Sequence, residues 1–297
     1  MDTRHMRYFV ALGETLHFGK AAERMHMSQP PFSRQIAALE QKLGVALVER
    51  NSRHVALTAA GRHFLEDCRA VLSGFEAACR DVKLVAEGMK GELKLGFMMH
   101  AAHSTVPALV RGYAQARPDV RLVLEERIPT DIEDMLVEGK LDAAVTFGGS
   151  PAPHLKIVRL ARDRLRLVAP LNHRLADLEI VAPADLAGQA IIAAPASVTP
   201  ILRSAISSYC AAGGSSPHFS FEPRLQQTII RLVAEGLGIG LIPQSMCSDL
   251  PSAVISRPLK DAPEFDVVLS ALAATNNPAV PALFEVAEAQ SQQASSR

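Results

Sequence analysis

A short run of polar side chains, QPPFSRQ at residues 29–35, has the residue types and the spacing to read the edges of DNA bases. Apolar residues recur in this region at helical spacing and define one buried stripe: Phe32, Ile36, Leu39 and Leu43. At about 100° per residue, Pro30, Ser33 and Arg34 point away from that stripe. The guanidinium of Arg34 offers paired donors that suit guanine or phosphate, and the Ser33 hydroxyl suits base edges or backbone. Taken alone, the same pattern also fits a solvated helix face.

Two consecutive prolines are compatible with this helix because they fall in its first turn. Ser28 suits the N-cap position, where its hydroxyl can accept a hydrogen bond from an unpaired backbone N–H. The missing N–H groups of Pro30 and Pro31 would have no intrahelical partner there, so the usual interior penalty of ~3 kcal/mol does not apply. Gly44 ends the helix.

The segments around this helix predict a DNA-binding module. A helix is expected over residues 4–16 and a short one over 19–25, joined to the helix above by a tight turn. Residues 46–57 predict a two-stranded hairpin that carries Arg50 and Arg53 and would form a wing. Residues 1–62 hold nine Lys and Arg against five Asp and Glu, a net charge of +4, whereas the whole chain is neutral. A basic N-terminal module in a neutral chain suits contact with phosphates.

These motifs together resemble a known family. The pieces SQPPFSRQI, LEQKLG, LVER and LTAAG, with the pair Ala21 and Ala22, are similar in order and spacing to the N-terminal winged helix-turn-helix of LysR-type transcriptional regulators. The segments RHMRYFVA and SQPPFSRQI resemble most the branch of this family that controls the breakdown of aromatic compounds. The resemblance implies that one set of residues enters the major groove, namely Gln29, Pro30, Pro31, Ser33 and Arg34. It also implies that Arg53 approaches the minor groove, with Arg50 on the same wing as the remaining DNA-binding candidate.

A long helix and hinge are expected over residues 58–90, capped by Thr58. Its apolar residues follow a heptad pattern, which favours pairing with a second helix: Phe64, Cys68, Val71, Phe75, Ala78, Val82 and Val85. Packing against its own chain is the alternative. The resemblance implies dimerisation through this helix, and five residues are the main candidates: Phe64, Cys68, Val71, Phe75 and Val82. A dimer would place two recognition helices on one two-fold-related DNA site.

Residues 91–297 alternate between strand and helix patterns, which is typical of parallel βαβ units. Strands are expected at residues 92–98, 119–126, 141–147, 165–169, 191–194, 218–221, 238–243 and 266–273, and helices at 104–116, 131–138, 200–211, 225–236 and from 278. The resemblance implies an α/β effector-binding domain of the two-lobed periplasmic-binding-protein type. Lobe I would then comprise residues 91–162 and 265–297, and lobe II residues 163–264. The terminal sequence QSQQASSR is typical of a disordered tail.

Ligands in such sheets bind at the carboxyl ends of the strands, between the lobes, where helix N-termini favour anions. The candidate effector-binding residues at these places are Met99, His100, Thr130, Phe147, Pro195, Ser197, Thr199 and Gln227. Where aromatic-pathway members often carry a small hydroxyl residue, this chain has His100, and Phe147 stands where an arginine could hold a dicarboxylate. The sequence therefore favours a neutral or singly charged aromatic ligand over a muconate-like dianion. His100 and His103 also fit ordinary cleft or surface histidines.

Several other functions are disfavoured. No GxSxG elbow, P-loop or catalytic carboxylate pair occurs, so neither an enzyme nor a cofactor is expected. His100 and His103 lack a third ligand nearby, so no metal site is expected. Four scattered cysteines suit a reducing cytoplasm, and neither an export signal nor a run of ~18 apolar residues is present, so a cytoplasmic protein without membrane contact is predicted.

The sequence thus predicts a ligand-responsive DNA-binding regulator, activator or repressor, that works as a dimer or tetramer. Its expected partners are double-stranded DNA, a small-molecule effector, further copies of itself and RNA polymerase. The alternative is an α/β small-molecule-binding protein or enzyme of the cytoplasm whose N-terminal helices serve only assembly.

Overall fold

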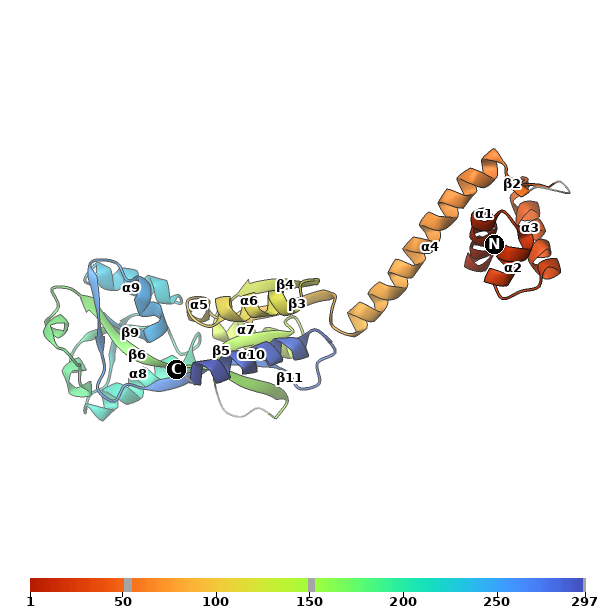
Figure 1. The fold of residues 1–297 in the computed structure, drawn as a ribbon. Helices are drawn as coiled ribbons and strands as arrows, with labels where there is room; N and C mark the ends of the chain where they lie inside the picture. The colour runs from red at the N-terminus through yellow and green to blue at the C-terminus, as the bar shows by residue number, and fades with distance from the viewer. Residues whose placement is uncertain (51–54, 149–152, 296–297) are drawn as a thin grey trace. The chain divides into compact units, whose positions relative to one another are not determined.

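The computed structural model describes residues 1–50, 55–148 and 153–295. The chain divides into two compact units, Met1–Leu84 and Val85–Arg297 (Figure 1). The first unit is helical with one small hairpin, and the second is built on a nine-stranded sheet.

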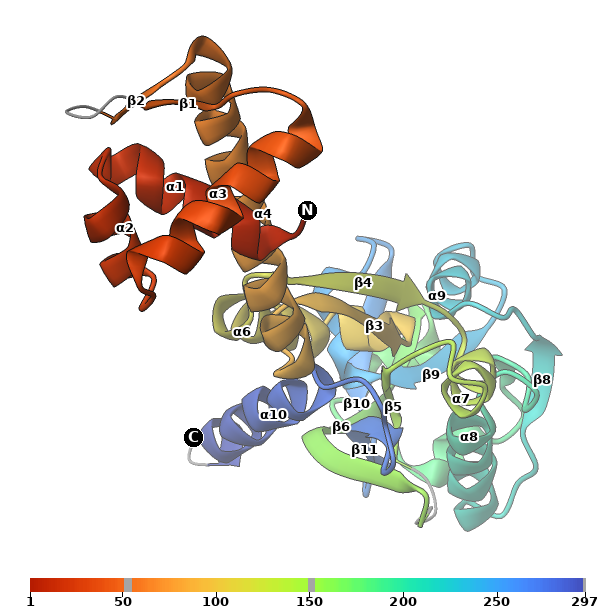
Figure 2. The ribbon, with the colours of Figure 1, turned by 90° about the vertical axis from the view of Figure 1, so that its right-hand side faces the viewer.

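The N-terminal unit contains the helices and the hairpin that the sequence predicts. Its elements are α1 (Thr3–Thr15), α2 (Phe18–Arg24), α3 (Gln29–Leu43), β1 (Val48–Arg50), β2 (Val55–Leu57) and α4 (Ala59–Ala86). Figure 2 shows α2 and α3 with the hairpin β1–β2 of the same unit. Fully buried side chains from the first three helices form the centre of its core: Phe9, Leu12, Ala21, Phe32, Ile36 and Leu39.

The start of α3 differs from the sequence prediction in one detail. Ser28 occupies the N-cap position, but its hydroxyl makes no capping hydrogen bond. An N-cap side chain accepts from the second or third residue of the helix, and these are Pro30 and Pro31, which have no N–H to offer. At the other end, Gly44 adopts φ of 70° as the left-handed cap. The apolar stripe ends at Leu39, because Leu43 in the last turn is 37% exposed.

The C-terminal unit contains nine strands and six α-helices among its described residues. The strands are β3 (Gly91–Phe97), β4 (Val120–Glu126), β5 (Ala143–Phe147), β6 (Leu155–Pro170), β7 (Ala190–Ile192), β8 (His218–Phe221), β9 (Ile239–Pro243), β10 (Val254–Pro258) and β11 (Glu264–Leu272). The helices are α5 (Met99–Ala102), α6 (Val106–Ala116), α7 (Pro129–Val137), α8 (Pro200–Ala212), α9 (Gln226–Ala234) and α10 (Val280–Ser295). The strand order is β4-β3-β5-β11-β6-β9-β7-β8, and β10 pairs with β6.

Strand β6 joins two halves of this sheet. From Leu155 to Arg164 it pairs antiparallel with β11, and from Leu165 onward it pairs with β9 and β10. The first half therefore contains the parallel strands β4, β3 and β5, and the second contains the parallel strands β9, β7 and β8. This change of partner lies next to the predicted division between residues 162 and 163. Helices α6, α7 and α10 belong to the first half, and α8 and α9 to the second (Figure 1).

Three predictions for this unit were wrong or incomplete. The strand expected at 165–169 begins ten residues earlier, at Leu155. Strand β10 and the short helix α5 were not predicted. The tail expected to be disordered continues α10 to Ser295, and there the Gln290 side-chain amide donates to the Ala108 carbonyl at 2.8 Å, which ties the helix to α6.

The start of α4 lies against the loop that precedes β1. A Cβ atom at Gly61 would lie 2.0 Å from the Leu47 carbonyl oxygen, so only glycine fits there. Thr58 fixes the same junction, since its hydroxyl accepts from the Gly61 N–H at 2.9 Å and donates to the Ala46 carbonyl at 2.9 Å. The predicted cap at Thr58 is confirmed.

Replacement of Gly61 by alanine is expected to lower the free energy of unfolding of the N-terminal unit by about 1–3 kcal/mol, because the backbone of Leu47 must move. Helix propensity alone would give the opposite sign, a gain of about 1 kcal/mol. Urea denaturation followed by circular dichroism measures the change. Ala60→Gly, at the exposed neighbouring position, is the control that isolates propensity. An alanine at position 61 that stabilises the unit would show that this close approach does not exist.

Candidate functional site

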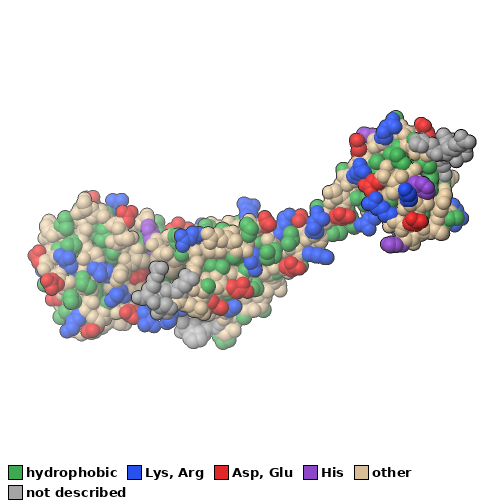
Figure 3. Space-filling view, in the orientation of Figure 1, with side chains coloured by type: hydrophobic (Ala, Val, Ile, Leu, Met, Phe, Trp, Pro, Cys, Tyr) green, Lys and Arg blue, Asp and Glu red, His purple; other side chains and the backbone are tan. Residues whose placement is uncertain are grey.

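The outer face of α3 presents the side chains that the sequence singled out. Gln29, Pro30 and Arg34 are exposed, and Pro31 and Ser33 are partly buried. Arg34 makes no hydrogen bond or ion pair with any described residue, so its guanidinium is available to a partner. Basic side chains lie on the visible face of this unit (Figure 3). The face combines one free cationic fork with a small hydroxyl and two proline rings that can make only apolar contacts.

The hairpin is fixed to this helix through Glu40. One carboxylate oxygen of Glu40 accepts from the backbone N–H groups of Leu47 and Val48, at 2.8 and 3.0 Å. Strand β1 therefore starts at a set position beside the C-terminal half of α3. Of the predicted wing contacts, Arg53 and the side chain of Arg50 lie outside the described part of the structure.

The predicted dimerisation seam on α4 is shorter than expected. Cys68 is 1% exposed and belongs to the core of its own unit, and Phe64 packs against that core beside Phe9. Cys68 is therefore not available to a second helix as predicted, because the first half of α4 completes the helix-turn-helix core, whereas the assignment of the partly buried Phe64 stays a prediction. The other three predicted residues lie after Cys68 and are exposed: Val71, Phe75 and Val82, the last at 70%.

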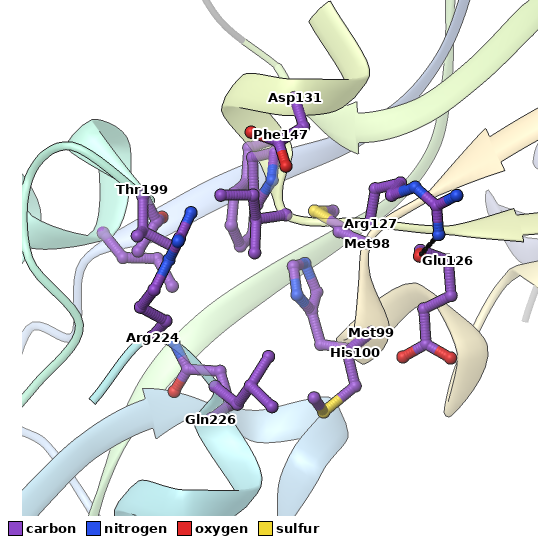
Figure 4. A pocket seen from close by; sticks show the side chains of 15 residues that line it. Met98, Met99, His100, Glu126, Arg127, Asp131, Phe147, Thr199, Arg224 and Gln226 are labelled. Atoms are coloured by element: carbon purple, nitrogen blue, oxygen red, sulfur yellow. Dashed lines mark hydrogen bonds between the residues drawn. The ribbon is translucent and has the colours of Figure 1, made fainter. Parts of the chain in front are cut away.

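A cavity of about 620 Å³ lies in the C-terminal unit, lined by elements of both half-sheets (Figure 4). Its apolar wall consists of Met98, Met99, Ile128, Pro129, Phe147, Val198, Leu202 and Leu225. Its polar residues are His100, Glu126, Arg127, Asp131, Thr199, Arg224 and Gln226. Helices α7, α8 and α9 begin at this cavity, so the positive ends of their dipoles are near it.

His100 is the polar residue at the centre of the first half-sheet's side of the cavity. It is 3% exposed, and its ring stacks on Phe147 with centroids 4.2 Å apart and planes 16° apart. Burial, with a smaller effect of nearby His103, lowers the pKa of His100 to about 3. The imidazole is therefore neutral at physiological pH, and its Nε2 has no hydrogen-bond partner among the described residues.

Two arginines bring positive charge to the cavity, and sequence analysis missed both. Arg127 follows β4 directly and donates to the Glu125 carboxylate at 3.2 Å. Arg224 follows β8 and makes no hydrogen bond or ion pair with the described residues, and Figure 4 shows its side chain reaching toward Thr199. Both come soon after the carboxyl end of a strand, which is where such sheets place ligand contacts, so this position was the available signal.

The predicted effector-binding residues fall into two groups. Met99, His100, Phe147 and Thr199 line the cavity. Thr130, Pro195, Ser197 and Gln227 are not among its lining residues, and their assignment to effector binding stays a prediction. The Thr130 hydroxyl instead donates to the Ser197 carbonyl at 3.3 Å, which connects α7 to the loop before α8.

Gln227 faces a different hollow of about 440 Å³ beside Arg231. The residue just before it, Gln226, is the one that lines the large cavity. The start of α9 was therefore predicted at the right place, but the residue there that lines the large cavity is Gln226 and not Gln227.

Two other kinds of site are missing from the described residues. No group of three or more His, Cys, Asp or Glu side chains is arranged there to hold a metal ion. No helix in that part of the chain has both the length and the apolar character needed to cross a bilayer.

Comparison with known protein families decides the class of the molecule. Residues 3–62 match the bacterial regulatory helix-turn-helix protein, lysR family, and residues 86–292 match the LysR substrate binding domain. The chain belongs to the LysR family of transcriptional regulators. The match covers both units, so the LysR-type resemblance noted in the N-terminal motifs extends to the domain that holds the cavity.

Individual LysR-type relatives agree over most of their length. The chain is 34% identical over 245 residues to the HTH-type transcriptional regulator AlsR of Bacillus subtilis, covering 82% of this chain and 81% of AlsR. It is 37% identical over 250 residues to CatR of Pseudomonas putida, covering 83% and 84%. The structure of full-length CbnR in complex with its target DNA superimposes with a TM-score of 0.83 at 23% identity, covering 98% of this chain and all of that one. This last likeness concerns the fold.

The family settles the function at a general level. The protein is a ligand-responsive DNA-binding LysR-type regulator and not an enzyme, and proteins of this class bind DNA and small-molecule effectors and form oligomers. The helix-turn-helix fold and the two-lobed α/β fold predicted from the sequence are confirmed.

Replacement of Arg34 by alanine is expected to weaken binding to a specific operator by about 1–3 kcal/mol, because a free guanidinium fork is lost from the outer face of α3. Fluorescence anisotropy against an operator recovered by genomic DNA pull-down, with a random duplex as reference at about 0.15 M salt, measures this loss. Lys42→Ala, at the far end of the same helix, is the control for a simple change of charge. Equal binding of both duplexes by wild type and Arg34→Ala would show that Arg34 does not read bases.

The neutral burial of His100 predicts a pH dependence of stability. Below pH 6.5 the unfolded chain protonates this histidine, whereas the folded chain keeps it neutral down to about pH 3. The free energy of unfolding should therefore fall by up to about 1.4 kcal/mol per pH unit across this window, or about 2 kcal/mol from pH 6.5 to pH 5. Urea denaturation at several pH values measures the slope.

His100→Phe should remove this contribution, since a phenyl ring can stack on Phe147 without titrating. His103→Gln, at an exposed neighbouring position, should leave the slope in place. An unchanged slope in His100→Phe would mean that another group carries the acid sensitivity.

Proposed function

We propose that the effector of this regulator is a small organic acid with a single carboxylate and a planar or apolar body, bound in the cavity of the C-terminal unit. The observation that carries the proposal is the unpaired guanidinium of Arg224 in the same cavity as the stacked pair His100 and Phe147. A carboxylate would give Arg224 the charged acceptor that it lacks.

The electrostatics of the cavity support one negative charge rather than two. The N-terminal ends of α7, α8 and α9 and the cation of Arg224 favour an anion. Arg127 is already paired with Glu125, and the carboxylates of Glu126 and Asp131 also line the space. A second carboxylate on the ligand would therefore meet repulsion rather than a free cation.

The apolar wall supports a planar body. Neutral His100 adds an aromatic face to Phe147, whose ring is also contacted edge-on by Phe265 at 4.9 Å. Methionine side chains at positions 98 and 99 can adapt to an irregular outline. A benzoate-like ring would bury its faces against these groups and keep its carboxylate for Arg224.

For the whole protein we infer a homodimer through the exposed residues of α4, notably Val71, Phe75 and Val82, that assembles further into a tetramer. The face of α3 with Gln29, Pro30, Pro31, Ser33 and Arg34 would enter the major groove. Because its target is DNA and the helix-turn-helix is bacterial, the protein is expected to act in the cytoplasm. Effector binding would shift the balance between lobe arrangements, and with it the bend of the bound DNA.

The cavity assignment predicts that Arg224→Gln lowers the affinity for benzoate and its ring-substituted forms at least tenfold, which corresponds to about 1.4 kcal/mol. Isothermal titration calorimetry with the full chain measures it. Arg231→Gln is the matched control, because Arg231 is an exposed cation of α9 that also lacks a described partner and lies outside this cavity. Equal loss in both variants, or no binding of any aromatic carboxylate by wild type, would contradict the proposal.

A further inference from the structure

Asp131 brings an unpaired negative charge to the cavity that a simple carboxylate ligand would not use. It is the third residue of α7, a position from which an acidic side chain can reach back to the N-cap N–H. Asp131 makes no such hydrogen bond here, nor any other hydrogen bond or ion pair with the described residues. Its carboxylate is therefore not engaged in holding the helix together.

The direction of the side chain distinguishes Asp131 from Glu126, the other acid that lines the cavity. In Figure 4, Asp131 extends from α7 on the side of Phe147, whereas the carboxylate of Glu126 points away from Phe147. Arg224 reaches into the same space from the connection between β8 and α9. The unpaired carboxylate of Asp131 and the unpaired guanidinium of Arg224 thus line one cavity from two different elements.

Three buried polar atoms at the same cavity also lack partners among the described residues: His100 Nε2, Thr199 Oγ1 and Gln226 Oε1. Buried polar atoms are nearly always hydrogen-bonded, and each unpaired one costs about 1–3 kcal/mol. A purely apolar ring with one carboxylate at Arg224 would leave most of these atoms, and Asp131, without a hydrogen-bond partner.

We propose that the effector carries, besides its carboxylate, a hydrogen-bond donor group, an ammonium or a hydroxyl, and that Asp131 receives it. This inference rests on the proposed function and narrows its ligand class to amino- or hydroxy-substituted aromatic acids. Such a molecule places its carboxylate at Arg224 and its donor at Asp131, so the charges of these two residues are both compensated. The unsubstituted acid should bind more weakly, because it would cover the carboxylate of Asp131, which is exposed to solvent in this structure, without supplying a donor.

Three probes that differ in one substituent test this: benzoate, and hydroxybenzoate and aminomethylbenzoate, the last two each in their meta and para forms. We expect the better isomer of at least one substituted probe to bind the full wild-type chain at least tenfold more tightly than benzoate, measured by calorimetry. A preference for aminomethylbenzoate alone identifies the donor as an ammonium, and a preference that includes hydroxybenzoate extends it to a neutral donor.

Asp131→Asn should reduce this preference to within about threefold, and an unchanged circular dichroism spectrum shows that the variant folds. Asp134→Asn, which removes the same charge from the same helix outside the cavity, should keep the full preference. Benzoate binding as tightly as every substituted probe, or a preference unchanged in Asp131→Asn, would overturn the inference but leave the proposed function standing. Failure of all the carboxylates to bind would overturn both.

Discussion

The antiparallel pairing of β6 with β11 is the constraint on which the C-terminal unit depends. Strand β6 pairs with β11 over its first ten residues and then with β9 and β10, so one continuous strand belongs to both half-sheets. Each half keeps its own parallel strands, and their carboxyl ends lead into helices that start at one cavity. If β6 ended at its first partner, Phe147 from one half and Thr199 from the other would have no fixed relation. The binding site is thus a consequence of strand pairing several residues away from it.

In the N-terminal unit, backbone hydrogen bonding determines which side chains are free. The prolines of α3 remove two N–H groups that would otherwise need a cap, and the Ser28 hydroxyl therefore has no capping hydrogen bond. The Glu40 carboxylate accepts from the backbone N–H groups of Leu47 and Val48 and so fixes the start of the hairpin. Arg34 is left unpaired on the outer face. A DNA-binding surface in a LysR-type regulator needs such a free cation, because a side chain already paired within the protein must break that bond before it can contact a base.

Sequence periodicity predicted most of the elements but fewer of the site residues, and the reason is physical. Apolar spacing reports which face of a helix is buried, so α3 and its core residues Phe32 and Ile36 were predicted correctly. Spacing does not say what covers that face, so Cys68 was assigned to a second helix although its own unit buries it. Arg127 and Arg224 fell outside the prediction because a charged residue in a loop carries no periodic signal. Only the strand order, which depends on pairing across more than a hundred residues, brings them to one cavity.

The burial of His100 has a consequence for the kind of molecule that the cavity can hold. A small hydroxyl residue at this position would leave the Phe147 ring open and add a flexible donor, whereas the imidazole covers one face of that ring and is neutral. Protonation would add a cation to the wall, but burial makes this unfavourable until the pH is far below the cytoplasmic range. The positive charge of the cavity is therefore supplied mainly by Arg224 and the helix N-termini, all of which belong to flanking elements rather than to its aromatic centre. A ligand that places its ring against Phe147 and its charge near Arg224 and the helix N-termini would match both the aromatic centre and the positive charge of the cavity. A compact dianion would match neither.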